Sequence, residues 1–158
     1  FSSCLGGDVG CLRNLCQVEE IMEREAVLSL NWEAYWTLCE ALADYVKKQT
    51  FPVKIRAITG VPRGGLIVAV CLSHLLKIEY TPIHLVERNP VGDEEYPTVL
   101  NTLLTDDLAD TGNSLLDVDW PGPQAVLIKK DGAKYLGPRV LDMPSGIWCR
   151  FPYEIDNG

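Results

Sequence analysis

The chain has 158 residues, a length that fits one domain able to cover a sheet on both faces. Its 47% hydrophobic and 23% charged content is ordinary for a soluble globular protein, and its net charge of −8 argues against general nucleic-acid binding, which needs a basic surface. The longest apolar run, 66–76, is broken by Ser73 and His74 and falls short of the ~20 residues that a membrane span requires.

Residues 1–21 differ from the rest of the chain, because they are rich in Gly and Cys and show no clear period. They lack the basic start and the apolar core of a signal peptide. Their cysteines, Cys4, Cys11 and Cys16, are not at a usual zinc spacing. We interpret 1–21 as a leader of uncertain role and expect the functional domain to occupy 22–158.

The chain has six cysteines and no CxxC pair. Cys39 and Cys71 lie in apolar helical patterns and are expected to be buried free thiols. This cysteine usage favours a reducing, cytoplasmic compartment.

A short strand followed by an amphipathic helix is expected first. The apolar run 26–30 predicts the strand, and Asn31 suits the N-cap of a helix over 31–49. Apolar residues recur at helical spacing along that segment, so Trp32 and Trp36 are expected in the core.

A glycine-rich turn separates the next strand, expected over 55–59, from a helix over 66–76. The turn, 60–65, has the sequence GVPRGG. Backbone N–H groups at a helix start attract anions, and Arg63 adds a fixed positive charge. The turn therefore suits an anionic group; a purely structural βα turn is the alternative.

A strand is expected over 80–87, with His84 as a packed core residue rather than a catalyst. The segment 88–98, RNPVGDEEYPT, is polar and contains two prolines and a glycine. It predicts an exposed, mobile loop.

The segment 103–116, LLTDDLADTGNSLL, joins the end of an expected strand over 99–105 to an acidic edge and a Gly-containing turn. At the carboxyl end of a parallel strand this order forms a phosphate site, with Gly112 allowing close approach. Thr111 and Ser114 add hydroxyl donors. The acidic residues are Asp106, Asp107 and Asp110. They would repel a bare phosphate, but carboxylates bind sugar hydroxyls and share Mg²⁺ with phosphate oxygens, so a sugar phosphate with a metal is predicted.

The last third of the chain predicts a brief helix over 115–120, an apolar strand over 124–128 and a tail over 140–154. Lys129 and Lys130 follow the strand and bring a cation to the same sheet edge as the two turns. A solvated lysine pair at a strand end is the alternative.

Together these motifs resemble the type I phosphoribosyltransferases over about 26–154. The segment 103–116 is similar to their phosphoribosyl-diphosphate (PRPP) signature. The loop at Arg63 matches the loop that binds the pyrophosphate of PRPP, where xanthine–guanine enzymes have a very similar Arg-Gly-Gly-Leu. The tail 140–154, with its strand-Asp-x-Pro opening and Trp148, resembles their C-terminal hood.

The resemblance implies an α/β fold with a mainly parallel central sheet of about five strands, helices on both faces and a small hood from the chain ends. It also implies a cis peptide bond at Pro62–Arg63 and a homodimer or homotetramer. The loop 88–98 matches a flexible loop that closes over the active site in the family, but it is short and lacks the Ser-Tyr pair of many relatives.

The resemblance also assigns roles to residues. Those expected at PRPP are Arg63, Gly64, Asp106, Asp107, Ala109, Asp110, Thr111, Gly112, Asn113 and Ser114. Lys129 is expected to read the exocyclic oxygen of a 6-oxopurine, Trp148 to stack on the purine and the backbone at Cys149 to contact the base edge. Asp107, Asp106 and Glu154 are the expected Mg²⁺ residues, and Asp110 and Arg63 the catalytic ones.

The implied reaction transfers phosphoribose from PRPP to guanine, xanthine or hypoxanthine, releasing pyrophosphate, as in purine salvage. Two alternatives stay open: a phosphoribosyltransferase for another base, and a non-catalytic PRPP- or nucleotide-binding regulator.

Overall fold

The computed structural model describes residues 27–92 and 95–154, and the leader lies outside them. The elements are β1 (Val27–Ser29), α2 (Trp32–Lys48), β2 (Ala57–Gly60), α3 (Gly64–Leu76), β3 (Glu79–Tyr80), a 3₁₀ turn η1 (Ile83–Leu85), β4 (Thr102–Ala109), α4 (Asn113–Val118), β5 (Gln124–Lys130), β6 (Arg139–Met143) and β7 (Trp148–Arg150).

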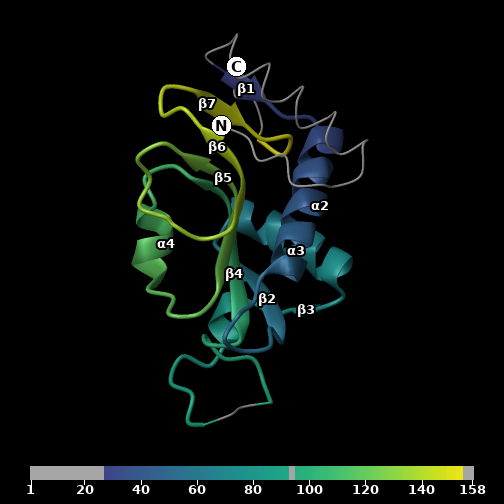
Figure 1. The fold of residues 1–158 in the computed structure, drawn as a ribbon, viewed down its shortest axis with the longest axis vertical. Coiled ribbons are helices and arrows are strands. Elements are labelled where there is room, and N and C mark those ends of the chain that lie inside the picture. The colour runs from purple at the N-terminus through teal and green to yellow at the C-terminus, as the bar shows by residue number, and fades with distance from the viewer. Residues whose placement is uncertain (1–26, 93–94, 155–158) are drawn as a thin grey trace.

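The central sheet has five strands in the order β3-β2-β4-β5-β6, and every neighbouring pair is parallel. Helices α2 and α3 lie on one side of it and α4 on the other (Figure 1). Strands β1 and β7 come from the two ends of the described chain and form a separate parallel pair at one end of the molecule, which is the expected hood (Figure 1). The predicted sheet, two-sided helices and hood are therefore confirmed.

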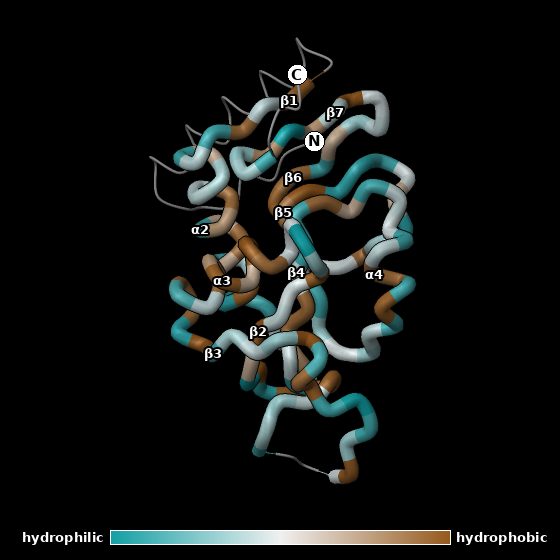
Figure 2. Tube along the Cα trace, turned by 180° about the vertical axis from the view of Figure 1, so that it is seen from behind, coloured by the Kyte–Doolittle hydropathy of each residue, from teal (hydrophilic) through white to brown (hydrophobic). Residues whose placement is uncertain are grey.

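The alternation of side chains along the strands divides the core into two clusters. Leu103 of β4 packs in the cluster that includes the buried residues of α2 and α3. Its neighbour Leu104 packs in the other cluster, with Leu115 of α4 and Trp120. Figure 2 shows the hydrophobic residues concentrated along the central strands and α3. Successive strand residues point to opposite faces, so a strand buried on both sides must be apolar almost throughout.

Helix α2 begins as predicted, because the Oδ1 of Asn31 accepts a hydrogen bond from the amide of Ala34 at 2.8 Å. The expected burial of its two tryptophans is wrong. Trp32 is 56% and Trp36 41% exposed, and the Trp36 indole donates to Glu40 at 2.9 Å. The core stripe follows Tyr35 and its helical neighbours instead, and the tryptophans flank it.

The strand expected over 80–87 is also wrong. Strand β3 ends at Tyr80, and the amide of Thr81 makes a last bond to Ile58 O at 2.9 Å. Pro82 has no N–H with which to continue the ladder. The chain turns into η1, where His84 is exposed rather than packed in the core.

Of the cysteines expected to be buried thiols, Cys39 is fully buried and Cys71 is half-buried, and both are free. The two thiols interact across the contact between α2 and α3. That contact, together with burial, raises the pKa of Cys39, while the same contact lowers the pKa of Cys71.

Candidate functional site

The glycine-rich turn lies directly against the end of β4. A side chain at Gly65 would place its Cβ 2.5 Å from the carbonyl oxygen of Thr105, and one at Gly64 would be 1.9 Å from Oδ2 of Asp107. The Thr105 hydroxyl is 3.0 Å from Thr59 O and 3.2 Å from Gly65 O, so it ties the turn to both strands. The Pro62–Arg63 peptide bond is cis, as expected.

The adjacent acids lie within the last half of β4 rather than after it, because β4 extends four residues beyond the last pairing with β2. Asp106 is only 6% exposed, and its Oδ1 accepts the Asp107 amide at 2.9 Å. Burial, with the neighbouring Asp107 carboxylate, raises the pKa of Asp106 to about 8. A hydroxyl-rich or cationic ligand at this edge would relieve the cost of a second buried charge.

A cavity of about 260 Å³ opens at this sheet edge. It collects residues from both turns, from β4 and β5, and from the hood. Its lining residues are Val61, Pro62, Arg63, Gly64, Asp106, Asp107, Leu108, Asp110, Ser114, Lys130, Trp148, Cys149, Phe151 and Glu154. Most of the predicted site residues therefore meet in one place, although they come from four separate segments.

Lys129 was expected at this cavity, but Lys130 lines it instead. Successive residues of a strand face opposite ways, so only one of the two lysines faces the cavity. The Lys130 Nζ is 3.3 Å from Oδ1 of Asp110 and 5.9 Å from the centre of the Trp148 ring. In this ion pair the Lys130 side chain is 7% exposed and the Asp110 side chain is 60% exposed.

The remaining turn residues shape the site more than they line it. Gly112 has φ of 85° and a Cβ there would be 2.7 Å from Lys134 O, so only glycine fits comfortably. Thr111 and Asn113 are exposed, with the Thr111 hydroxyl accepting the Asn113 amide at 3.2 Å. Ala109 is buried in the same core cluster as Leu115 of α4 and does not line the cavity.

The hood contributes three of the predicted residues. Trp148 is 61% exposed at the cavity, which leaves its ring free to stack on a ligand. Cys149 is buried, and burial raises the pKa of its thiol to about 12. Glu154 lines the cavity, and its Oε2 accepts the amide of Phe151 at 2.8 Å.

Tyr153 was not among the predicted site residues, and its hydroxyl donates a hydrogen bond to Oδ2 of Asp107. An aromatic residue near a chain end carries no signal of such a contact, because its partner is 46 positions away.

The loop that was compared with a closing loop lies elsewhere. Its ends are joined by the bridge between Glu87 and Thr98, just before β4 begins, and Figure 1 places it at the end of the molecule opposite β1 and β7. Arg88 donates to Val118 O at 2.7 Å and so anchors the loop to the C-terminal end of α4. The described parts of this loop therefore lie at the amino edge of the sheet, away from the cavity.

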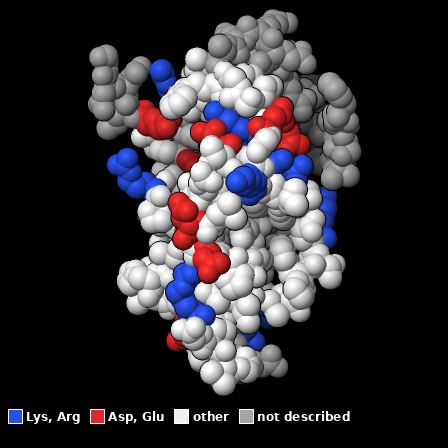
Figure 3. All heavy atoms as spheres, turned by 90° about the vertical axis from the view of Figure 1, so that its left-hand side faces the viewer, with Lys and Arg blue, Asp and Glu red and all other residues white. Residues whose placement is uncertain are grey.

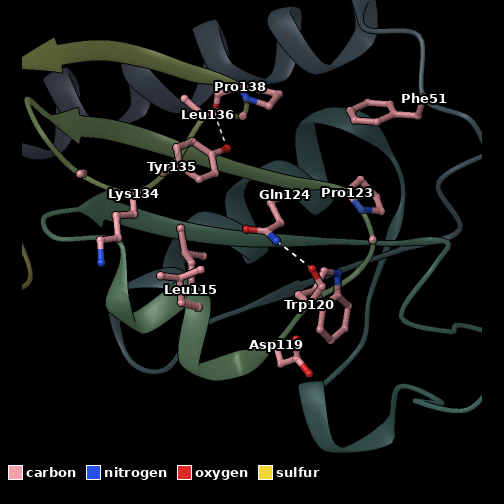
Figure 4. A pocket seen from close by; sticks show the side chains of 14 residues that line it. Phe51, Leu115, Asp119, Trp120, Pro123, Gln124, Lys134, Tyr135, Leu136 and Pro138 are labelled. Atoms are coloured by element: carbon pink, nitrogen blue, oxygen red, sulfur yellow. Dashed lines mark hydrogen bonds between the residues drawn. The ribbon is translucent and has the colours of Figure 1, made fainter.

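A larger cavity of about 800 Å³ lies between α4 and the segment before β6 (Figure 4). Its aromatic lining is mostly satisfied: the Tyr135 hydroxyl donates to Pro138 O at 2.8 Å and the Trp120 indole to Thr102 O at 3.1 Å. None of the predicted site residues lines it. The smaller cavity, with its carboxylates and cations, gathers most of the predicted site residues and is the candidate site.

Acidic and basic side chains alternate on the face drawn in Figure 3, without a continuous basic surface there. Within residues 27–92 and 95–154, no helix has the length and apolarity to cross a membrane.

Comparison with solved structures defines the fold class of the chain. The chain has the fold of the type I phosphoribosyltransferases. A xanthine-guanine-hypoxanthine phosphoribosyltransferase from Helicobacter pylori superimposes with a TM-score of 0.62 over 82% of this chain and 95% of its own, at 24% identity. A purine phosphoribosyltransferase from Pyrococcus horikoshii gives 0.61 over 85% and 98%, at 27% identity.

Comparison of sequences finds relatives that are named for a more specific activity. A xanthine-guanine phosphoribosyltransferase from Idiomarina loihiensis is 26% identical over 141 residues, covering 80% of this chain and 86% of that protein. No family model matches the chain. The predicted resemblance to the type I phosphoribosyltransferases is confirmed. The predicted enzyme class, a phosphoribosyltransferase, is confirmed by these relatives.

Proposed function

We propose that the protein transfers phosphoribose from PRPP to a 6-oxopurine and releases pyrophosphate. This proposal rests on three groups of residues that line one cavity. They are the acids of 103–116, the turn that carries Arg63, and the pair formed by Lys130 of β5 and Trp148 of the hood. The first two suit a sugar diphosphate, and the third suits a flat base with an exocyclic oxygen. The named activity of the xanthine-guanine relative agrees with this combination.

PRPP would lie along the sheet edge in this proposal. Residues 110–114 offer backbone N–H groups to the 5′-phosphate, and Asp106 and Asp107 face the ribose hydroxyls. Arg63, exposed in its turn, would contact the pyrophosphate. A fixed cation there stabilises the negative charge that develops as the C1–oxygen bond breaks.

Mg²⁺ fits the donors that the site offers. Among the described residues no group of three or more His, Cys, Asp or Glu is arranged around a metal position. Magnesium in phosphate enzymes commonly uses one or two carboxylates and takes its other ligands from substrate phosphates and water. Asp106 and Asp107 would supply those carboxylates, with Glu154 at the same cavity. Bound there, the ion would neutralise the pyrophosphate charge.

The base would stack on Trp148, with the Lys130 ammonium donating to its exocyclic oxygen. A purine ring nitrogen then forms the new bond to C1 while the C1–pyrophosphate bond breaks. Asp110 accepts the proton that this nitrogen loses. Lys130 lies close enough to keep the Asp110 carboxylate oriented. Cytoplasmic location and a homodimer or homotetramer are part of the same proposal.

The direct test incubates the protein with PRPP, Mg²⁺ and, separately, guanine, xanthine, hypoxanthine, adenine and uracil, and measures pyrophosphate release. Release with a 6-oxopurine supports the proposal, and Asp110→Asn should then lower turnover about 10²-fold or more. PRPP binding without release with any base would favour the regulator instead.

A further inference from the structure

The Asp107 carboxylate is held by hydrogen bonds on both of its oxygens. Its Oδ1 accepts the amide of Leu108 at 2.7 Å, and its Oδ2 accepts the hydroxyl of Tyr153. The Leu108 bond comes from β4 itself, whereas the Tyr153 bond comes from the segment after β7. A carboxylate with a donor on each oxygen has little freedom to rotate, so the hood and the central sheet together set its orientation.

The ring of Tyr153 is itself fixed by other aromatic rings. It stacks on Phe151, with centroids 5.5 Å apart and planes 4° from parallel. The ring of Tyr35 meets it edge-on at 5.7 Å and 90°. The ring of Trp32, on α2, has its centroid 6.2 Å from that of Tyr153. The Tyr153 hydroxyl therefore belongs to a ring that is packed in a cluster and not to a mobile side chain.

Oδ2 also lies close to the first residue of α3, because a Cβ at Gly64 would lie 1.9 Å from that oxygen. Asp107 is thus bounded by the Gly64 backbone, its own strand and the Tyr153 hydroxyl. Since Asp107 lines the cavity, any change in its direction changes what it presents to a ligand.

We propose that Tyr153 is a positioning residue, which holds the Asp107 carboxylate in the orientation that receives the ribose hydroxyls and metal of PRPP. This inference rests on the proposed function for the identity of that ligand. Through Tyr153, the position of the hood and the orientation of Asp107 become linked, because one segment carries both this hydroxyl and the residues around Trp148.

Tyr153→Phe tests the proposal, since it removes the hydroxyl and leaves the ring cluster. A hydrogen bond to a charged group is worth enough that PRPP affinity, measured by calorimetry with Mg²⁺ and no base, should fall roughly 10-fold or more. The melting temperature should stay close to that of the unaltered protein. In turnover, the KM for PRPP should rise while the KM for the base stays the same.

Tyr35→Phe is the matched control. Tyr35 belongs to the same ring cluster, and its buried hydroxyl forms no geometrically complete hydrogen bond within the described residues, although the Cys39 thiol lies near it. This variant should bind PRPP as the unaltered protein does. Equal PRPP affinity in Tyr153→Phe and the unaltered protein would overturn the inference.

The calorimetric measurement separates this inference from the proposed function. Normal turnover with unaltered PRPP affinity in Tyr153→Phe would remove the positioning role alone. Weakened PRPP binding in that variant, in a protein that releases no pyrophosphate, would retain the positioning role and refute the transferase proposal. Failure of the unaltered protein to bind PRPP would overturn both.

Discussion

In the proposed mechanism, selection of the base depends on Lys130 and not on Lys129. Lys130 lies 3.3 Å from Asp110 and faces the cavity with Trp148. Lys130→Ala should lower kcat/KM for a 6-oxopurine by about 10²-fold, a cost in the range seen when a site loses a charged hydrogen bond to its substrate. Steady-state kinetics at saturating PRPP would measure it.

The matched variant is Lys129→Ala, which removes a lysine from the other face of β5 and should change kcat/KM less than threefold or so. A larger loss at Lys129 than at Lys130 would return the base-reading role to the residue expected from the sequence.

A second residue-scale prediction concerns Asp106, whose pKa is raised to about 8 by burial and by Asp107. The unfolded chain releases this proton near pH 4. Between those values the unfolded state binds fewer protons than the folded state, so Asp106 makes the ligand-free protein less stable as pH rises, by up to about 1.4 kcal/mol per pH unit.

Asp106→Asn removes that titration. In metal-free buffer, the melting temperature of the unaltered protein should fall relative to that of the variant from about pH 5 to pH 8, and the variant should be the more stable at pH 8. Parallel pH profiles for the two proteins would show that Asp106 is not buried as described.

The residue types of 103–116 indicated a sugar phosphate, yet they did not give the directions of the side chains. Lys129 was assigned by resemblance, whereas β5 extends through Lys130, and the alternation of side chains along it turns Lys130 toward the cavity. The Tyr153 contact is not predictable, since it depends on how the hood folds back over β4. The packing of distant segments, rather than a local sequence pattern, decides the Tyr153 contact.

At the scale of elements, the start of α3 fits against β4 only because its first residues are glycines. Gly64→Ala would put a Cβ 1.9 Å from Oδ2 of Asp107, so the carboxylate would have to leave the orientation that its two hydrogen bonds set. The variant should therefore fold with a modest loss of stability, about 1 kcal/mol, while PRPP binding is weakened at least 10-fold by the displaced carboxylate.

Gly146→Ala is a suitable control, because a Cβ there meets nothing within 4 Å. Calorimetry with PRPP and thermal melting of both variants would decide. Normal PRPP binding by Gly64→Ala would contradict the close packing of the turn against Asp107.

The elements with strong local signals were predicted well. The helix over 31–49 follows from its cap and its period, and the two glycine-containing turns follow from their residues. The strand over 80–87 was wrong because alternating Ile83 and Leu85 resemble a strand, whereas Pro82 ends the ladder. Trp32 and Trp36 were misplaced because hydrophobicity alone does not say which side of a broad apolar stripe faces the sheet.

At the scale of the whole molecule, residues 27–154 build the sheet, the helices on both of its faces and the hood, and residues 1–26 lie outside the part of the chain that the structure describes. The domain limits therefore remain a prediction that is easily tested. A chain that starts at Met22 should fold, melt within a few degrees of the full sequence and release pyrophosphate at a similar rate. Aggregation or loss of activity on removal of 1–21 would show that the leader is part of the functional domain.

The proposed oligomer also belongs to this scale. Sedimentation at micromolar concentration should give a homodimer or homotetramer, whereas a stable monomer with full activity would refute that part of the proposal.

The central claim, that a 6-oxopurine is the acceptor, is tested most directly by competition. The protein is supplied with PRPP, Mg²⁺ and an equimolar mixture of guanine, xanthine, hypoxanthine, adenine and uracil, and the nucleoside monophosphates formed are identified by mass spectrometry. Monophosphates of the 6-oxopurines should dominate the products, and Lys130→Ala should remove that preference. Predominant formation of the adenine or uracil nucleotide, or no nucleotide from a protein that binds PRPP, would contradict it.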